Sequence, residues 1–137
     1  MKITICGSMR LSREMVELKN KLEKIGHSVR LPDFTEEYSK MQTTDEGHSE
    51  SVKNKLEHDL IRGHFKEIKN SDAVLVVNET LKGIKNYVGG NTFLEMGFAH
   101  ILNKKIFILN NIPQMGYSDE IVAMQPIVLD GDLGKIK

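Results

Sequence analysis

Hydrophobic and polar positions follow two distinct patterns along the chain. Short runs rich in β-branched residues predict strands over 3–7, 72–78, 106–109 and 126–129, with a weaker one over 28–31. Between them, apolar residues recur every three or four positions over 12–25, 50–69, 92–102 and 119–124, as in amphipathic helices. Segment 33–50 shows neither pattern and is polar, so we expect a loop or a lid there.

Strands and helices alternate throughout, which predicts an α/β fold with a mostly parallel sheet and helices on both faces. Right-handed connections then favour a flavodoxin-like (Rossmann-like) three-layer sandwich of five strands in the order 2-1-3-4-5. The 137 residues are expected to form a single domain, 1–137. In such a sheet, ligands bind beyond the carboxyl ends of the strands, near the switch point between the first and third strands.

Composition narrows the classes of partner. The chain is 39% hydrophobic and 28% charged with zero net formal charge, so no basic excess argues for nucleic acid. The first residues lack the pattern of a signal peptide, and no apolar run has the length of a membrane helix. We therefore expect a cytoplasmic protein that binds neither nucleic acid nor a membrane.

Metal sites and cofactors are not expected either. Cys6 is the single cysteine, which leaves no internal disulfide and no cysteine-based metal cluster, and we interpret it as a small buried apolar residue. His58 and His64 are six positions apart and do not form the i, i+4 pair of a helical zinc site.

The loop after the first strand contains Gly7, Ser8, Met9 and Arg10. It lies at the carboxyl edge of the predicted sheet and leads into the start of a helix, where backbone N–H groups favour an anion. Arg10 has the fork geometry to bind a phosphate. The alternative is a plain β–α turn with a solvated arginine.

A second candidate loop follows the third strand. Asn78 stands at its carboxyl end, and Gly89, Gly90, Asn91 and Thr92 lead into the next helix. The two glycines allow the backbone to approach a ligand closely, and Asn91 or Thr92 is a natural N-cap. These residues are predicted to bind a substrate, although a glycine-rich helix entry alone accounts for the same pattern.

Glu95 is out of pattern, because it stands in the first turn or so of a helix that is apolar on nearly every side. The helix N-terminus favours its ionised form, and a poorly solvated, oriented carboxylate can act as a nucleophile. Alternatively, it only complements the helix dipole. Asp72 begins the third strand, away from the carboxyl edge, so we expect it to bond nearby backbone.

These residues carry a resemblance to a known family. Cys6–Arg10 looks like the first loop of 2′-deoxynucleoside 5′-phosphate N-hydrolases, and Asn91–Ala99 resembles the nucleophile helix of nucleoside 2-deoxyribosyltransferases. The resemblance extends from Met1 to the region of Asn110. It implies a flavodoxin-like fold, a homodimer or larger homo-oligomer, and two loops that hold sugar hydroxyls or a 5′-phosphate. It also implies cleavage of a nucleoside N-glycosidic bond through a covalent glycosyl-Glu95 intermediate.

The chain departs from the family at three positions. The family's aspartate before the third strand is replaced, by spacing, with His64, which can serve as an acid near neutral pH. A glycine, Gly89 or Gly90, replaces an acid shortly before the nucleophile, and Ser8 or Met9 replaces a tyrosine. The prediction is hydrolysis or transfer at the N-glycosidic bond of a nucleoside or nucleoside 5′-monophosphate, with Glu95 and His64 catalytic. The alternative is a non-catalytic nucleotide-binding or sensing domain.

Overall fold

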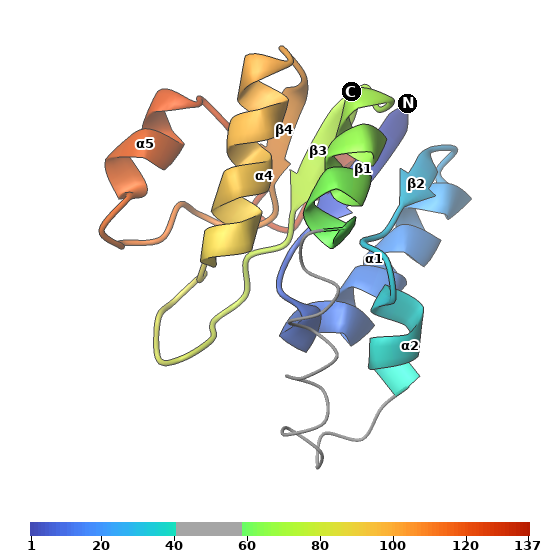
Figure 1. The fold of residues 1–137 in the computed structure, drawn as a ribbon, viewed down its shortest axis with the longest axis horizontal. Helices are drawn as coiled ribbons and strands as arrows, with labels where there is room; N and C mark the ends of the chain where they lie inside the picture. Colours follow the sequence, from blue (N-terminus) through green and yellow to red (C-terminus); the bar gives the residue numbers. More distant parts are fainter. Residues whose placement is uncertain (41–58) are drawn as a thin grey trace.

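A parallel β-sheet forms the middle of the molecule. The computed structural model describes residues 1–40 and 59–137, and its strands lie in the order β2-β1-β3-β4-β5 (Figure 1). Their bounds are Lys2–Cys6 (β1), Ser28–Arg30 (β2), Ala73–Val76 (β3), Lys105–Ile108 (β4) and Ile127–Val128 (β5). All adjacent pairs are parallel. The predicted fold class and strand order are therefore confirmed.

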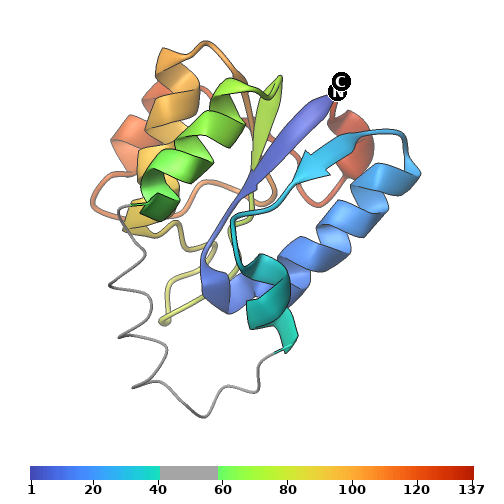
Figure 2. The same ribbon diagram turned by 45° about the vertical axis from the view of Figure 1, so that its right-hand side comes forward.

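Helices cover both faces of this sheet. On one face lies α1 (Ser12–Lys24), whose side chains Met15, Leu18 and Leu22 are buried against the sheet. On the other face lie the helix over residues 59–69 and helices α4 (Gly90–Ile101) and α5 (Ser118–Ala123), as Figures 1 and 2 show. Two 3-10 turns, η1 (Met9–Leu11) and η2 (Leu133–Lys135), complete the fold.

Alternation along β1 sorts its side chains between the two cores. Ile3 and Ile5 pack with α1, whereas Cys6 packs on the opposite face with Val76 of β3 and the helices there. Cys6 is paired in register with Val76, so it stands at the carboxyl end of the two central strands. The alternation places its thiol under the helix 59–69 and α4.

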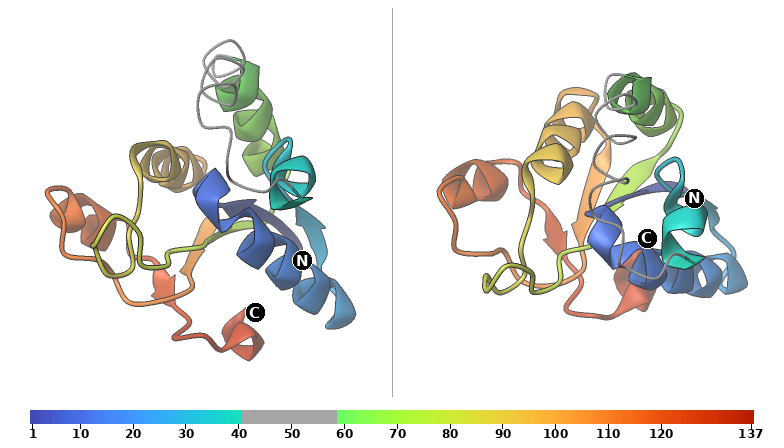
Figure 3. Two further views of the ribbon diagram at one scale, coloured as in Figure 1. Left: turned by 90° about the horizontal axis from the view of Figure 1, so that it is seen from below. Right: turned by 60° about the horizontal axis from the view of Figure 1, so that its bottom comes forward.

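The two ends of the sheet have different roles. Both chain termini lie close together at the amino end of β1 (Figures 1 and 2). The opposite, carboxyl edge carries the η1 turn, the start of α4 and the first described residues of the helix over 59–69, which Figure 3 shows from below. This is the edge at which the fold rule places ligands.

The segment predicted as a loop or lid over 33–50 is not all loop. It contains α2 (Thr35–Lys40), which was missed because this helix has almost no apolar periodicity. The Thr35 hydroxyl donates to the carbonyl of Pro32 at 2.5 Å, and the Lys19 ammonium lies 3.5 Å from a Glu36 carboxylate oxygen. Tertiary packing on α1 thus supplies what the sequence pattern lacks. Residues 41–58, with the rest of that segment and the start of the predicted helix 50–69, lie outside the described residues.

Helix α4 begins earlier than predicted. Its N-cap is Gly89, in an extended conformation, and not Asn91 or Thr92, and no side chain caps it. The first helical hydrogen bond runs from the Phe93 N–H to the Gly89 carbonyl at 2.9 Å. Glu95 consequently lies in the second turn, where the charge of the helix terminus acts less strongly than in the first.

Within residues 1–40 and 59–137, none of the helices combines the length and the apolar character needed to cross a membrane.

Candidate functional site

Three side chains from distant parts of the chain meet at the carboxyl end of β1. His64 Nε2 lies 2.8 Å from Glu95 Oε2 and 3.6 Å from Cys6 Sγ. Cys6 is fully buried, and His64 and Glu95 retain 7% and 18% of their side-chain exposure. Apolar side chains would fill this place equally well, so the grouping of a carboxylate, an imidazole and a thiol indicates a functional site. We refer to Cys6, His64 and Glu95 as the carboxyl-edge cluster.

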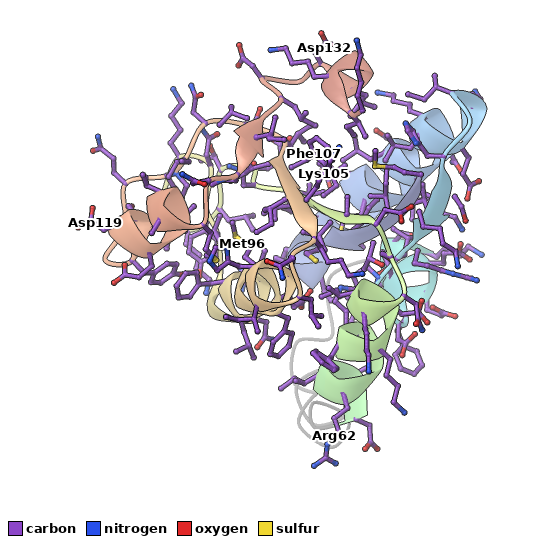
Figure 4. All side chains as sticks on the ribbon, turned by 90° about the horizontal axis from the view of Figure 1, so that it is seen from above. Arg62, Met96, Lys105, Phe107, Asp119 and Asp132 are labelled. Carbon is purple, nitrogen blue, oxygen red and sulfur yellow. The ribbon has the colours of Figure 1, made fainter. Side chains whose placement is uncertain are left out.

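The helix over 59–69 places His64 in this cluster. His64 and Ile68 are four residues apart, so they share the helix face that is buried against the sheet. At the end of the helix, the Ser71 hydroxyl donates to the Glu67 carbonyl at 2.8 Å and shares a 2.6 Å hydrogen bond with the Thr4 hydroxyl of β1. The helix is therefore fastened to the strand that carries Cys6. By contrast, Arg62 points away from the molecule (Figure 4).

Glu95 has an unusual carboxylate. Glu95 stands three residues after the buried Thr92 and directly before Met96, which is fully buried in the core. Figure 4 shows Met96 on α4. Oε2 lies 2.8 Å from His64 Nε2, but this buried oxygen makes no well-aligned hydrogen bond among the described residues. A buried carboxylate oxygen without a well-aligned hydrogen bond is costly, and a ligand with a hydrogen-bond donor or a positive charge would satisfy it.

The burial of Cys6 raises the pKa of its thiol well above the usual range, and the negative charge of Glu95 raises that pKa further. The thiol is thus neutral in the isolated protein. Sequence reasoning interpreted Cys6 as packing only. Its burial is confirmed, but its contact with His64 was missed. The available signal was its position as the last residue of β1, at the edge where ligands bind.

The loop after β1 continues directly from Cys6. A Cβ at Gly7 would fit tightly, because it would lie 3.0 Å from Met15 Sδ and 3.4 Å from the Val77 carbonyl oxygen. The Ser8 hydroxyl accepts from the Arg10 N–H at 3.3 Å and caps the η1 turn. Met9 Sδ lies 3.9 Å from the Thr35 hydroxyl, and the Arg10 side chain is exposed. The predicted substrate contacts of these four residues stay predictions.

The loop after β3 is held by Asn78, which is fully buried. Its Oδ1 accepts from the Asn110 N–H at 2.8 Å, and its Nδ2 donates to the carbonyls of Asn110 and Asn111 at 3.1 and 3.0 Å. This side chain therefore ties the loops after β3 and β4 together. Its predicted substrate contact stays a prediction, but its structural task is evident.

The entry to α4 is braced from α5. The Tyr117 hydroxyl donates to the Val88 carbonyl, and the Tyr117 ring stacks on Phe93 with the ring centroids 4.4 Å apart. Gly89 is held close to the Tyr87 ring, since a Cβ there would lie 3.3 Å from it. Of the remaining predicted binding residues, Gly90 and Asn91 are exposed and Thr92 is buried. The glycine-rich entry is consequently a fixed element at the edge that carries the cluster.

Replacing Asn78 with alanine should destabilise the protein by about 2–4 kcal/mol, because the part-buried backbone groups of Asn110 and Asn111 lose the hydrogen bonds that the Asn78 amide makes to them. Urea denaturation followed by circular dichroism measures this change in the free energy of unfolding. Asn20→Ala, at an exposed position of α1, is the control and should change it by less than about 0.5 kcal/mol. Equal stabilities of the two variants would contradict the bracing role.

Two other features lie outside the cluster. Asp72 is structural, as predicted, because its Oδ2 accepts from the Lys2 N–H at 2.8 Å. An apolar groove of about 640 Å³ runs along the outer side of α4, lined by Phe65, Phe93, Leu94, Phe98 and Ile101 among others, and includes none of the cluster residues. Apart from Glu120, the residues that line this groove are apolar or glycine.

Comparison with known proteins supports the fold. No protein-family model matches the chain, and no curated protein matches its sequence. A 2-deoxyribosyltransferase structure from Bacillus psychrosaccharolyticus superimposes with a TM-score of 0.55 at 18% identity, covering 80% of this chain and 72% of the other. The CMP N-glycosidase BcmB of Clostridium botulinum does so with a TM-score of 0.52 at 17% identity, covering 93% and 85%. The chain therefore has the fold shared by a 2-deoxyribosyltransferase and a CMP N-glycosidase.

Proposed function

We propose that the protein hydrolyses the N-glycosidic bond of a nucleoside 5′-monophosphate, with Glu95 as the nucleophile. The observation that carries this proposal is the Glu95 carboxylate, which stands at the carboxyl edge beside His64 with a buried oxygen that makes no hydrogen bond to residues 1–40 or 59–137. The shared fold with a deoxyribosyltransferase and a CMP N-glycosidase supports the same class of reaction.

The reaction proceeds in two displacements at the anomeric carbon. A Glu95 oxygen attacks that carbon, the bond to the base nitrogen breaks, and its electron pair leaves with the base, which takes a proton from solvent. Water then attacks the same carbon and releases a proton to solvent, the ester bond to Glu95 breaks with its electron pair returning to the carboxylate, and the carboxylate is restored. Two inversions give a sugar phosphate of retained configuration.

His64 acts on Glu95 in this scheme. Its Nε2 is 2.8 Å from the carboxylate and the ring is almost fully buried, so it is better placed to orient and stabilise Glu95 than to protonate a base. Contacts that are misaligned in a free enzyme commonly tighten when substrate binds. The predicted acid role thus becomes, in our proposal, a positioning role.

The test is a panel of ribo- and deoxyribonucleosides with and without a 5′-phosphate, incubated with the full chain and separated by chromatography. Release of free base together with a sugar phosphate is the expected result. Release that requires a second base as acceptor would indicate transfer. If instead a nucleotide raises the melting temperature without being consumed, the protein is a binding or sensing domain.

Arg10 is proposed to bind the 5′-phosphate. It is exposed in the η1 turn, four residues after Cys6 and next to the start of α1, where backbone N–H groups favour an anion. Arg10→Ala should raise KM for the monophosphate about 10- to 100-fold, as expected for a charge-assisted contact. KM for the matching nucleoside should stay unchanged. Arg13→Ala, one turn further on and also exposed, is the control; equal effects of the two variants would contradict the assignment.

A further inference from the structure

We infer that the carboxyl-edge cluster of Cys6, His64 and Glu95 binds Zn²⁺, and that the bound ion inhibits the protein by occupying its carboxylate. The binding site is argued from the geometry of the three side chains. The inhibitory consequence rests on the proposed function, in which Glu95 is the nucleophile.

The donor atoms suit zinc. A thiol sulfur, an imidazole nitrogen and a carboxylate oxygen lie within 4.8 Å of one another, and zinc binds all three of these ligand types. Mg²⁺ and Ca²⁺ prefer oxygen ligands and need six or more of them. The cluster therefore selects for a transition-type ion over the abundant alkaline-earth ions.

The spacing suits a tetrahedral ion. With Zn–S near 2.3 Å and Zn–N near 2.05 Å, tetrahedral ligands place sulfur and nitrogen about 3.6 Å apart, and Cys6 Sγ lies 3.6 Å from His64 Nε2. The same geometry places nitrogen and oxygen about 3.3 Å apart, whereas His64 Nε2 and Glu95 Oε2 are 2.8 Å apart. A shift of about half an ångström in the Glu95 side chain, which is partly exposed, closes this difference.

The buried carboxylate oxygen of the cluster favours binding of a cation. Glu95 Oε2 is buried without a hydrogen-bond partner among the described residues, although it is close to an imidazole nitrogen. A cation placed between the three groups satisfies this oxygen and compensates its charge. Three protein ligands are present, and the partly exposed Glu95 marks the side from which a fourth ligand, such as water, can reach the ion.

Zinc binding replaces the thiol proton of Cys6 and uses an electron pair of Glu95. Zn²⁺ displaces the proton of the Cys6 thiol, which passes to the buffer, and the resulting thiolate donates an electron pair to the metal. An oxygen electron pair of Glu95 forms the Zn–O bond and is then not available to attack an anomeric carbon. Removal of the ion by a chelator, with return of the proton, reverses both changes.

Isothermal titration calorimetry of the metal-free full chain with ZnCl₂ tests the site. One ion per chain is expected, with proton release that shows as a dependence of the binding heat on the ionisation enthalpy of the buffer. Titration with Co²⁺ should produce a thiolate-to-cobalt charge-transfer band in the near ultraviolet. The band must be absent in Cys6→Ser.

Variants separate this site from adventitious binding. Cys6→Ser and Glu95→Gln should each weaken zinc binding at least about tenfold, whereas His100→Gln, at an exposed histidine of α4, should leave it unchanged. Because Cys6 is buried, each variant is first checked by its metal-free melting temperature, and Glu95→Gln provides the independent loss if Cys6→Ser does not fold. Unchanged affinity in Glu95→Gln, or no binding by the wild-type protein, overturns the site.

The inhibitory consequence is measured with the substrate that the nucleotide panel identifies. Zinc should suppress base release and EDTA should restore it, and Mg²⁺ at the same concentration should have no effect. In Cys6→Ser the half-inhibiting concentration should rise at least about tenfold, relative to the metal-free rate of that variant. A rate unchanged at saturating zinc overturns the inhibition. If the protein binds zinc but consumes no nucleotide, the metal site is supported and the proposed hydrolase function is contradicted. The metal site and the function can therefore fail independently.

Discussion

Replacing Glu95 with glutamine should lower the rate of base release about a thousandfold or more. Loss of the group that forms the covalent intermediate removes one whole reaction path, and such losses in other hydrolases are of this size or larger. The amide has nearly the same shape as the carboxylate, so the neighbouring packing of Met96 is kept. The measurement is kcat/KM for the best substrate of the panel, with chelator present throughout.

The control for this result is Glu17→Gln, which removes a carboxylate from an exposed position of α1 on the other face of the sheet and should leave kcat/KM unchanged. Mass spectrometry of the wild-type protein, quenched during turnover of a slow substrate, should show the added mass of one sugar phosphate. The adduct should be absent in Glu95→Gln. Full activity of Glu95→Gln would remove Glu95 as the nucleophile.

The sheet could be predicted because its strands are short apolar runs covered on both faces. All four residues of β3, Ala73–Val76, are buried, and such a run has few interpretations when it stands between helical patterns. Gly26 follows directly on the predicted helix 12–25, and it adopts a φ of 100° that favours glycine. Alternation of elements and the handedness rule then left few strand orders to consider.

Helix α2 and the start of α4 were not predicted, because they depend on contacts and backbone conformation rather than on a periodic pattern of apolar residues. Helix α2 (Thr35–Lys40) is polar, and it is held by bonds such as that from the Thr35 hydroxyl to Pro32. The start of α4 at Gly89 follows from backbone conformation, with no capping side chain to reveal it. In both places, tertiary structure overrides a local preference that a single sequence expresses weakly.

The candidate site was predictable only in part, because the sequence pattern indicates single residues and not the contacts between them. Glu95 is conspicuous as an acid in an apolar helix, and the family resemblance indicates His64 because His64 stands at the spacing of the family's aspartate. The structure places the side chains of Glu95 and His64 2.8 Å apart. Cys6 was overlooked because a buried cysteine in a strand is usually packing. Its contact with His64 arises from two segments 58 residues apart, and no local pattern encodes such a pairing.

Replacing His64 with alanine should lower kcat about a hundredfold and change KM much less, if His64 positions Glu95 as proposed. In our proposal the His64–Glu95 contact aligns into a hydrogen bond when substrate binds. A hydrogen bond to a charged group contributes about 1.5–3 kcal/mol, and about 2.7 kcal/mol corresponds to a hundredfold change in rate. The loss falls on kcat because the contact acts on the attacking carboxylate and not on the bound substrate. Steady-state kinetics with chelator present measures both constants.

The conservative variant decides between positioning and simple support of the fold. His64→Gln places an amide near the position of Nε2 and should recover about tenfold of the rate that His64→Ala loses, whereas both variants leave Ile68 and the Ser71–Thr4 bond to fasten the helix. His100→Gln, on the exposed side of α4, should behave like the wild-type protein. If the rates of the variants instead follow their melting temperatures, with no recovery in His64→Gln, then His64 supports the packing of the helix and Glu95 acts without it.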